Sequence, residues 1–218
     1  MFNIKSSLCL LSAALMTIMA APEASAAGLA PTGNFVSVRV NGSHVAYGAI
    51  LSPTRILVPA HVVGGAIATY SILAGSSDRT VTTCATCELR SASSVVRHPN
   101  YNGGISYAND VAIIHVPALT LNANIYGSTI ASSFSNAVGT QFTQIGFGTG
   151  GTNHNVLRTT VTSPWTLATT TGYTYTPGDF VTASTDTSLN GMISYYQSAN
   201  QLQVYTKLSD FIAWINAN

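Results

Sequence analysis

The chain has 218 residues and is poor in charge, with eight Lys and Arg against seven Asp and Glu and a formal net charge of +1. Binding to a phosphate backbone needs clustered basic residues, so we expect no nucleic-acid partner. Uncharged polar residues must cover most of the surface, which is typical of an extracellular protein.

The first 26 residues have the pattern of a secretory signal peptide. Lys5 precedes an apolar run over residues 8–19, and small residues follow in Ala24-Ser25-Ala26-Ala27. A membrane anchor is the alternative, but the run is too short and no basic cluster follows it. We therefore expect a cleaved signal at residues 1–26, secretion of residues 27–218 as one domain, and no membrane segment.

Short predicted strands follow one another along the rest of the chain. They are rich in β-branched and aromatic residues and are bounded by Gly, Pro, Asn and Ser, which is typical of an all-β sandwich or barrel. The predicted strands cover residues 35–40, 44–51, 55–58, 67–73, 94–96, 111–116, 141–147, 189–195 and 202–205.

The segment Asn41-Gly42-Ser43 between the first two predicted strands has two interpretations. Asn-x-Ser is the acceptor sequence for N-glycosylation, which would modify Asn41. Asn-Gly is also the favoured pair for a two-residue hairpin turn. The residues agree equally well with both.

The cysteines favour a local disulfide over a metal site. Cys9 lies in the predicted signal, which leaves Cys84-Ala85-Thr86-Cys87. Two cysteines are weak evidence for zinc, and a thioredoxin-type site would need a helix that begins at the first cysteine. We expect a Cys84–Cys87 disulfide, which stabilises the fold little because its loop is short. We expect no metal and no cofactor.

The C-terminal segment is the one predicted helix. Ser209 or Asp210 can cap its start. Its apolar residues recur at helical spacing: Leu208, Phe211, Ile212 and Ile215.

Three segments carry the candidate chemistry. His61 ends an apolar strand, Asp110 begins another, and Gly178-Asp179-Phe180 comes later in the chain. Histidine, aspartate and then Gly-Asp-Ser is the chain order of a chymotrypsin-type triad. In that order His61 takes the proton of the nucleophile and Asp110 holds the imidazole. Phe180, however, stands where the serine would be.

The order of motifs resembles that of the trypsin/chymotrypsin family of serine proteases. The resemblance covers nearly the whole mature chain and implies two antiparallel six-stranded β-barrels, a C-terminal helix and an active site between the barrels. Besides the segments around His61, Asp110 and Phe180, the matching segments are residues 97–101, 145–149, 191–195, 204–207 and 211–215.

The departures from the family pattern concern the nucleophile and its surroundings. The resemblance places the catalytic serine at Phe180 and keeps one oxyanion-hole position at Gly178. The family's cysteine pair beside the histidine becomes Ala46 and Val62. Active members insert a new amino terminus beside the aspartate that matches Asp179, and no matching Ile-Val-Gly-Gly start is visible.

The resemblance also locates a substrate pocket at Thr174, Ser194, Tyr195, Tyr196 and Gln203. Thr174 falls at its floor, so no acidic group would attract Lys or Arg. Tyr196 and Gln203 stand at wall positions that are commonly glycine, and we expect their side chains to narrow or close the pocket.

These features predict a secreted serine-protease homologue without its nucleophile. We expect a monomer that binds an extracellular protein, such as a protease, a hydrolase or an inhibitor target, as a decoy, inhibitor or effector. The alternative is an active endopeptidase or esterase that uses His61, Asp110 and a displaced serine, Ser184 or Ser188. A structural or storage protein is a third hypothesis.

Overall fold

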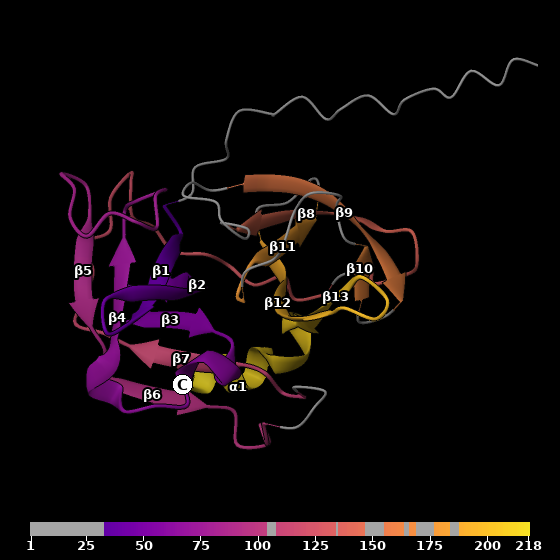
Figure 1. The fold of residues 1–218 in the computed structure, drawn as a ribbon, viewed down its shortest axis with the longest axis horizontal. Helices are drawn as coiled ribbons and strands as arrows, with labels where there is room; N and C mark the ends of the chain where they lie inside the picture. Colours follow the sequence, from indigo (N-terminus) through magenta and orange to yellow (C-terminus); the bar gives the residue numbers. More distant parts are fainter. Residues whose placement is uncertain are drawn as a thin grey trace, which may run out of the picture.

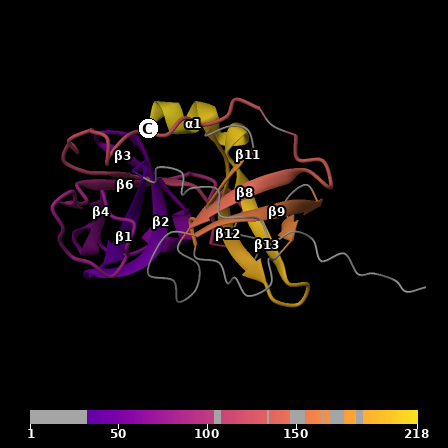
Figure 2. The ribbon, with the colours of Figure 1, turned by 90° about the horizontal axis from the view of Figure 1, so that it is seen from above.

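The computed structural model describes residues 33–103, 108–133, 135–146, 155–163, 166–168, 177–183 and 188–218. The signal-peptide prediction, Thr174 and Ser184 fall outside these residues. Two sheets lie side by side, the first built from the N-terminal half and the second from the C-terminal half (Figures 1 and 2). In the described part of the chain, no helix has the length and apolar character needed to cross a membrane.

The first sheet has seven strands in the order β5-β4-β1-β2-β3-β7-β6. The two end strands of this order follow each other in the chain, separated by Ala92 and Ser93. The Ala92 amide donates to Tyr70 O at 2.9 Å, and the Ser93 amide donates to His115 O at 2.8 Å. The strands are β1 (Phe35–Val40), β2 (Ser43–Ser52), β3 (Arg55–Val58), β4 (Tyr70–Ala74), β5 (Glu88–Ser91), β6 (Ser94–Arg97) and β7 (Ala112–His115).

The break at Ala92-Ser93 explains why seven strands stand where the resemblance implied six. β5 pairs with β4, and β6 pairs with β7, so the two act as one bent strand that brings the ends of the sheet together. The predicted strand over residues 67–73 begins only at Tyr70, because residues Ile67–Thr69 form a short 3-10 helix, η2.

The second sheet is a closed six-stranded barrel in the order β10-β13-β12-β11-β8-β9, which confirms the predicted all-β class and its second barrel. Its strands are β8 (Gln141–Gly146), β9 (Asn155–Ser163), β10 (Thr166–Ala168), β11 (Phe180–Ala183), β12 (Leu189–Gln197) and β13 (Leu202–Lys207).

The chain returns to the first barrel after β13. It forms a 3-10 turn, η3 (Leu208–Phe211), and then the predicted C-terminal helix, α1 (Ile212–Ala217). Neither Ser209 nor Asp210 is the N-cap of this segment; Lys207 precedes η3, and its side chain pairs with Asp210 at 3.1 Å.

Aromatic contacts and one arginine fix α1 against the first barrel. The His98 ring packs edge-on against Phe211 and Trp214, with centroids 5.3 and 5.1 Å apart. The Arg55 guanidinium donates to the carbonyl oxygen of Ile215. The C-terminal helix therefore joins the two halves of the molecule.

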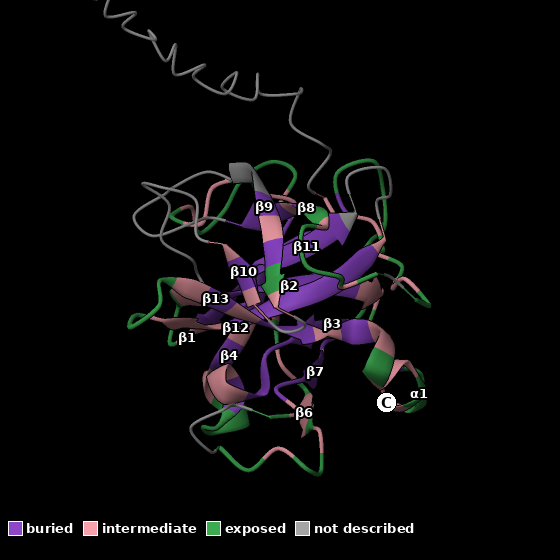
Figure 3. Ribbon diagram, turned by 90° about the vertical axis from the view of Figure 1, so that its right-hand side faces the viewer, coloured by how far each residue is buried: buried purple, intermediate pink, exposed green. Residues whose placement is uncertain are grey.

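The two barrels share a hydrophobic core. One cluster of buried residues combines Phe35, Tyr47 and Leu57 of the first barrel with Phe180 and Met192 of the second. Figure 3 shows the buried residues along the strands that meet there, including β2, β8 and β11. Burial of these large apolar side chains at about 25 cal/mol per Å² makes the contact between the barrels a major source of stability.

The Asn41-Gly42 segment forms the predicted hairpin turn. Both residues have positive φ, 50° for Asn41 and 82° for Gly42, as a type I′ turn requires. Val40 pairs with Ser43 across the turn. Both turn residues are exposed, and glycosylation of Asn41 stays a prediction.

A partly buried histidine lies beside two arginines at the same end of the first barrel. His44 Nδ1 is 2.8 Å from Ser37 Oγ. Burial first, and then the charges of Arg79 and Arg39, lower the pKa of His44 from 6.5 to about 4. His44 has no acidic neighbour in sequence that would indicate this environment in advance.

The free energy of unfolding is expected to decrease as the pH falls from about 6.5 to about 4. In this window the folded protein keeps His44 neutral while the unfolded chain takes up the proton, so acid favours unfolding. The loss from His44 is on the order of 2–3 kcal/mol. Urea denaturation across this pH range measures it, with His44→Gln as the matched variant. An equally steep pH dependence in the variant would assign the effect to another group.

Candidate active site

His61 lies at the junction that follows β3. Pro59 has an extended backbone, and η1 (Ala60–Val63) begins directly after it. His61 Nδ1 lies 2.8 Å from Asp110 Oδ2, and the His61 backbone amide donates to Asp110 Oδ1 at 2.8 Å. The predicted contact between the two residues is therefore present, and it is made through both the side chain and the backbone of His61.

Asp110 is fully buried and accepts a third hydrogen bond, from the hydroxyl of Ser194 on β12. Three donors offset much of the cost of removing the carboxylate from water. With its Nδ1 hydrogen directed at the carboxylate, the neutral imidazole has its basic lone pair on Nε2. The His61 side chain is 18% exposed, so the geometry suits a general base.

The residue expected at the nucleophile position lies in the core. Phe180 is the first residue of β11 and is fully buried, between Ile145 of β8 and Met192 of β12. Its ring stacks on Phe35 at a centroid distance of 5.3 Å. The described part of this apolar cluster does not include His61. Residue 180 therefore contributes to the contact between the barrels.

Gly178 differs from its expected role. It has φ of 83°, and a Cβ there would collide with the carbonyl oxygen of Tyr47, so the position requires glycine. Its amide donates to Ile193 O at 3.0 Å. The resemblance implied that the Gly178 amide is an oxyanion-hole donor. In the structure, this amide is hydrogen-bonded to Ile193 of β12.

Asp179 is buried in a polar cluster that was not among the predicted contacts. The Gln144 side-chain amide donates to Asp179 Oδ2 at 3.1 Å. Gln144 and Gln203 also exchange two hydrogen bonds, at 2.9 and 3.0 Å. A Cβ at Gly146 would overlap the carboxylate, which explains the glycine there. A strand glutamine is thus a hydrogen-bond donor to the Asp179 carboxylate.

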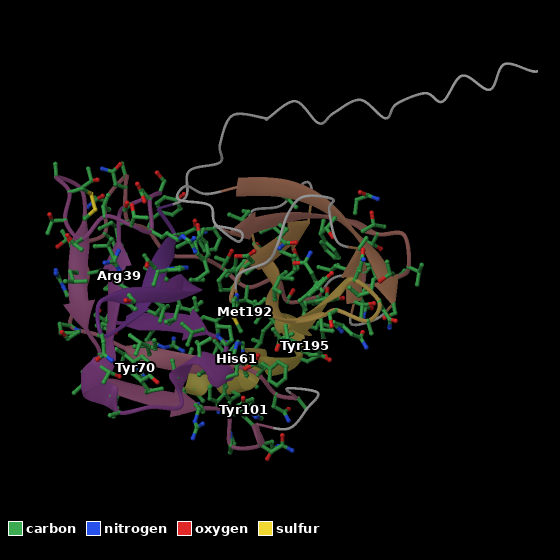
Figure 4. The ribbon with its side chains drawn as sticks, in the orientation of Figure 1. Arg39, His61, Tyr70, Tyr101, Met192 and Tyr195 are labelled. Atoms are coloured by element: carbon green, nitrogen blue, oxygen red, sulfur yellow. A yellow bond between two sulfur atoms is a disulfide. The ribbon has the colours of Figure 1, made fainter. Side chains whose placement is uncertain are left out.

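The predicted pocket residues separate into two groups. Ser194 and Gln203 are buried, and their side chains are hydrogen-bonded to Asp110 and Gln144. Tyr195 and Tyr196 are half-buried on β12, opposite Val204 and Gln203 of β13. In Figure 4, His61 comes from the first barrel and Tyr195 from the second. Whether Tyr196 and Gln203 narrow a substrate pocket stays a prediction.

Of the two candidate displaced serines, Ser188 lies within the described residues. Its hydroxyl is 3.0 Å from that of Thr129, in the segment that joins the two barrels. The next residue, Leu189, exchanges backbone hydrogen bonds with Thr129 and Ala131. These contacts fix Ser188 at the start of β12.

The cysteine prediction is confirmed, since Cys84 and Cys87 form a disulfide. Ala46 and Val62, the positions that the resemblance assigned to the family's cysteine pair, belong to the apolar cluster of the first barrel. Among the residues with described positions, no group of three His, Cys, Asp or Glu side chains could hold a metal ion.

The comparisons with known proteins agree with this architecture. Residues 27–187 match the family model described as Trypsin. Trypsin zeta of Drosophila erecta is 36% identical over 81 residues, which cover 36% of this chain and 28% of that protein's length. A mutant of human heparin binding protein (CAP37) has a TM-score of 0.75 at 16% identity, covering 86% of this chain and 92% of the other. At that identity, the likeness shows the fold.

Proposed function

Since the chain belongs to the trypsin family, we propose that it is a secreted member without a catalytic serine that acts by binding another extracellular protein. One observation carries the proposal. The residue after Gly178-Asp179 is Phe180, buried in the core between the barrels, although His61 and Asp110 keep the geometry of a base and its partner.

Two parts of an acyl-transfer site support the loss of catalysis. A nucleophile needs an oxygen or sulfur within hydrogen-bond reach of its base, and Phe180 has neither. An oxyanion hole needs donors directed at the developing charge, and the Gly178 amide instead donates to Ile193 O. Loss of the nucleophile typically reduces turnover about a millionfold.

The hydrogen-bonded geometry around Asp110 has a structural use without catalysis. The carboxylate belongs to the segment before β7, whereas Ser194 lies on β12 of the other barrel. Asp110 O also accepts a bond from Thr206 of β13 at 3.4 Å. The polar network therefore joins the barrels, and His61 and Asp110 belong to that junction.

A site without a nucleophile can still bind another protein, and the surface beside Asp110 suits this function. Tyr195 and Tyr196 are half-buried on β12, beside the Ser194–Asp110 bond. Large aromatic side chains with a polar tip are enriched at protein interfaces. The partner is an extracellular protein, a protease, a hydrolase or an inhibitor target, and the chain acts on it as a monomeric decoy, inhibitor or effector.

The predicted signal at residues 1–26 and the disulfide both support secretion. Disulfides persist in oxidising compartments and are rare in the cytosol. Mass spectrometry of the protein from culture medium should find an amino terminus after residue 26. A full-length chain retained in cells would contradict this part of the proposal.

The intact contact between His61 and Asp110 also favours a second candidate, hydrolysis through a displaced serine. Ser184 and Ser188 are the candidate nucleophiles for it. Ser188 is hydrogen-bonded to Thr129 in the joining segment, which gives it a structural role at the start of β12. A serine used in catalysis would make hydrolysis depend on His61.

Wild-type protein and His61→Ala are expected to hydrolyse peptide and ester substrates at the same background rate. Without a nucleophile for His61 to activate, removal of the imidazole changes nothing in turnover. Steady-state assays of both proteins, purified in parallel, measure this. General-base catalysis typically contributes about a hundredfold or more to a rate. A wild-type rate that exceeds the His61→Ala rate by such a factor would establish the displaced-serine alternative.

A further inference from the structure

The β4–β5 loop, residues 75–87, carries chemistry that the proposed function does not use. It contains the disulfide between Cys84 and Cys87. Cys84 is exposed and Cys87 is half-buried. An exposed sulfur can be reached by an attacking thiolate, and disulfides in exposed positions are the labile ones.

The disulfide contributes little to the stability of the fold. It joins residues separated by three positions in the chain, and a loop this short restricts the unfolded chain only slightly. The Cys87 amide also donates to Cys84 O at 3.1 Å, so a backbone bond closes the same turn. Opening the disulfide therefore leaves the turn with its own hydrogen bond.

Other contacts hold the β4–β5 loop against the barrel. The buried Arg39 guanidinium donates to the carbonyl oxygens of Arg79, at 2.9 Å, and Val81. Thr86 Oγ1 donates to Gly75 O at 3.0 Å and so ties the two ends of the loop together. None of these bonds involves a sulfur atom. When the disulfide is reduced, the two thiols stay close enough to form it again.

We propose that Cys84–Cys87 is a thiol–disulfide exchange site for low-molecular-weight thiols such as glutathione. The thiolate of the reductant attacks the Sγ of Cys84, the more exposed residue of the pair. The sulfur–sulfur bond breaks, and its electron pair leaves on Cys87 Sγ, which takes a proton from water. The first product is a mixed disulfide between Cys84 and the small thiol.

A second molecule of thiol completes the reduction. It attacks the small-molecule sulfur of the mixed disulfide, and Cys84 leaves as a thiolate. The protein gains two electrons, and two thiols become one small-molecule disulfide. The reverse sequence reoxidises the site. These steps use neither His61 nor Asp110, so they are independent of the proposed function.

Folded protein equilibrated in glutathione buffers of graded redox ratio tests the proposal. Samples are quenched with acid, alkylated and mapped by peptide mass spectrometry. The expected result is reversible opening of the disulfide, with the mixed disulfide at Cys84 and an unchanged circular dichroism spectrum. The double variant Cys84→Ser/Cys87→Ser is expected to melt within a few degrees of wild type.

Two single variants identify the attacked sulfur. In Cys87→Ser the exposed Cys84 thiol is expected to react with oxidised glutathione several times faster than the Cys87 thiol does in Cys84→Ser. The proposal is overturned if the wild-type disulfide stays oxidised in millimolar reduced glutathione until denaturant is added. It is also overturned if reduction unfolds the first barrel, because the disulfide would then be structural.

Discussion

Phe180→Ser is expected to destabilise the protein by about 3–5 kcal/mol and to create no protease, although it restores the residue type of the family's nucleophile. The Phe180 ring is fully buried and stacks on Phe35. Serine would leave a cavity in the core and would place a hydroxyl among apolar side chains. Urea denaturation measures the loss of stability, and peptide and ester hydrolysis measures activity.

Phe180→Leu is the matched control for this substitution. It keeps an apolar side chain in the cluster and is expected to cost only about 1–2 kcal/mol. Hydrolysis by Phe180→Ser that depends on His61, in a protein as stable as wild type, would contradict the account. It would show that residue 180 faces the imidazole and that one substitution had removed the activity.

Asp110→Ala is expected to cost about 3 kcal/mol or more, the second large effect. The carboxylate accepts from the His61 imidazole, the His61 amide and the Ser194 hydroxyl in a fully buried position. Its removal leaves those donors without their charged acceptor, and each such bond is worth about 1.5–3 kcal/mol. Urea denaturation measures the change in the free energy of unfolding.

His61→Ala is the control for Asp110→Ala and is expected to cost less. The histidine is 18% exposed, and Asp110 keeps the backbone amide of residue 61 and the Ser194 hydroxyl. The double variant should show a coupling energy of about 0.5–3 kcal/mol. Loss of less than about 1 kcal/mol in Asp110→Ala would mean that the carboxylate does not sustain the junction between the barrels.

The sequence was informative where local pattern and chain order decide the structure. Alternating apolar residues in segments such as residues 35–40 predicted strands, and Asn41-Gly42 predicted the hairpin turn that the positive φ values confirm. β5 was not predicted because Glu88-Leu89-Arg90-Ser91 contains a single apolar residue, Leu89. Leu89 is itself 51% exposed, so the strand has no apolar pattern that would indicate it. That strand is set by its pairing with β4, which local sequence does not encode.

The candidate site was predictable only in part, because its contacts join distant segments. The order of His61 and Asp110 indicated their contact. Ser194 was assigned to the substrate pocket, whereas its hydroxyl donates to Asp110 on the other barrel. Gln144 offered one signal that could have been used. It lies two positions after Phe142 in β8, and residues two apart on a strand share a face, so both side chains lie on the same buried face.

The direction of the Phe180 side chain could not be obtained from the sequence. Motif order placed residue 180 beside the histidine, but its environment depends on how β11 pairs with β8 and β12 and on how the barrels pack. The bond from the Gly178 amide to Ile193 O has the same origin. Both follow from tertiary packing between segments that are far apart in the chain.

Covalent labelling of the secreted protein with a fluorophosphonate probe, beside its His61→Ala variant, measures directly whether the site holds an activated serine. Such probes react with a serine that a neighbouring base activates. For a site without a nucleophile, neither protein is expected to be labelled. Labelling of wild type that disappears in His61→Ala would contradict this expectation, and mapping of the tagged residue would then identify the nucleophile.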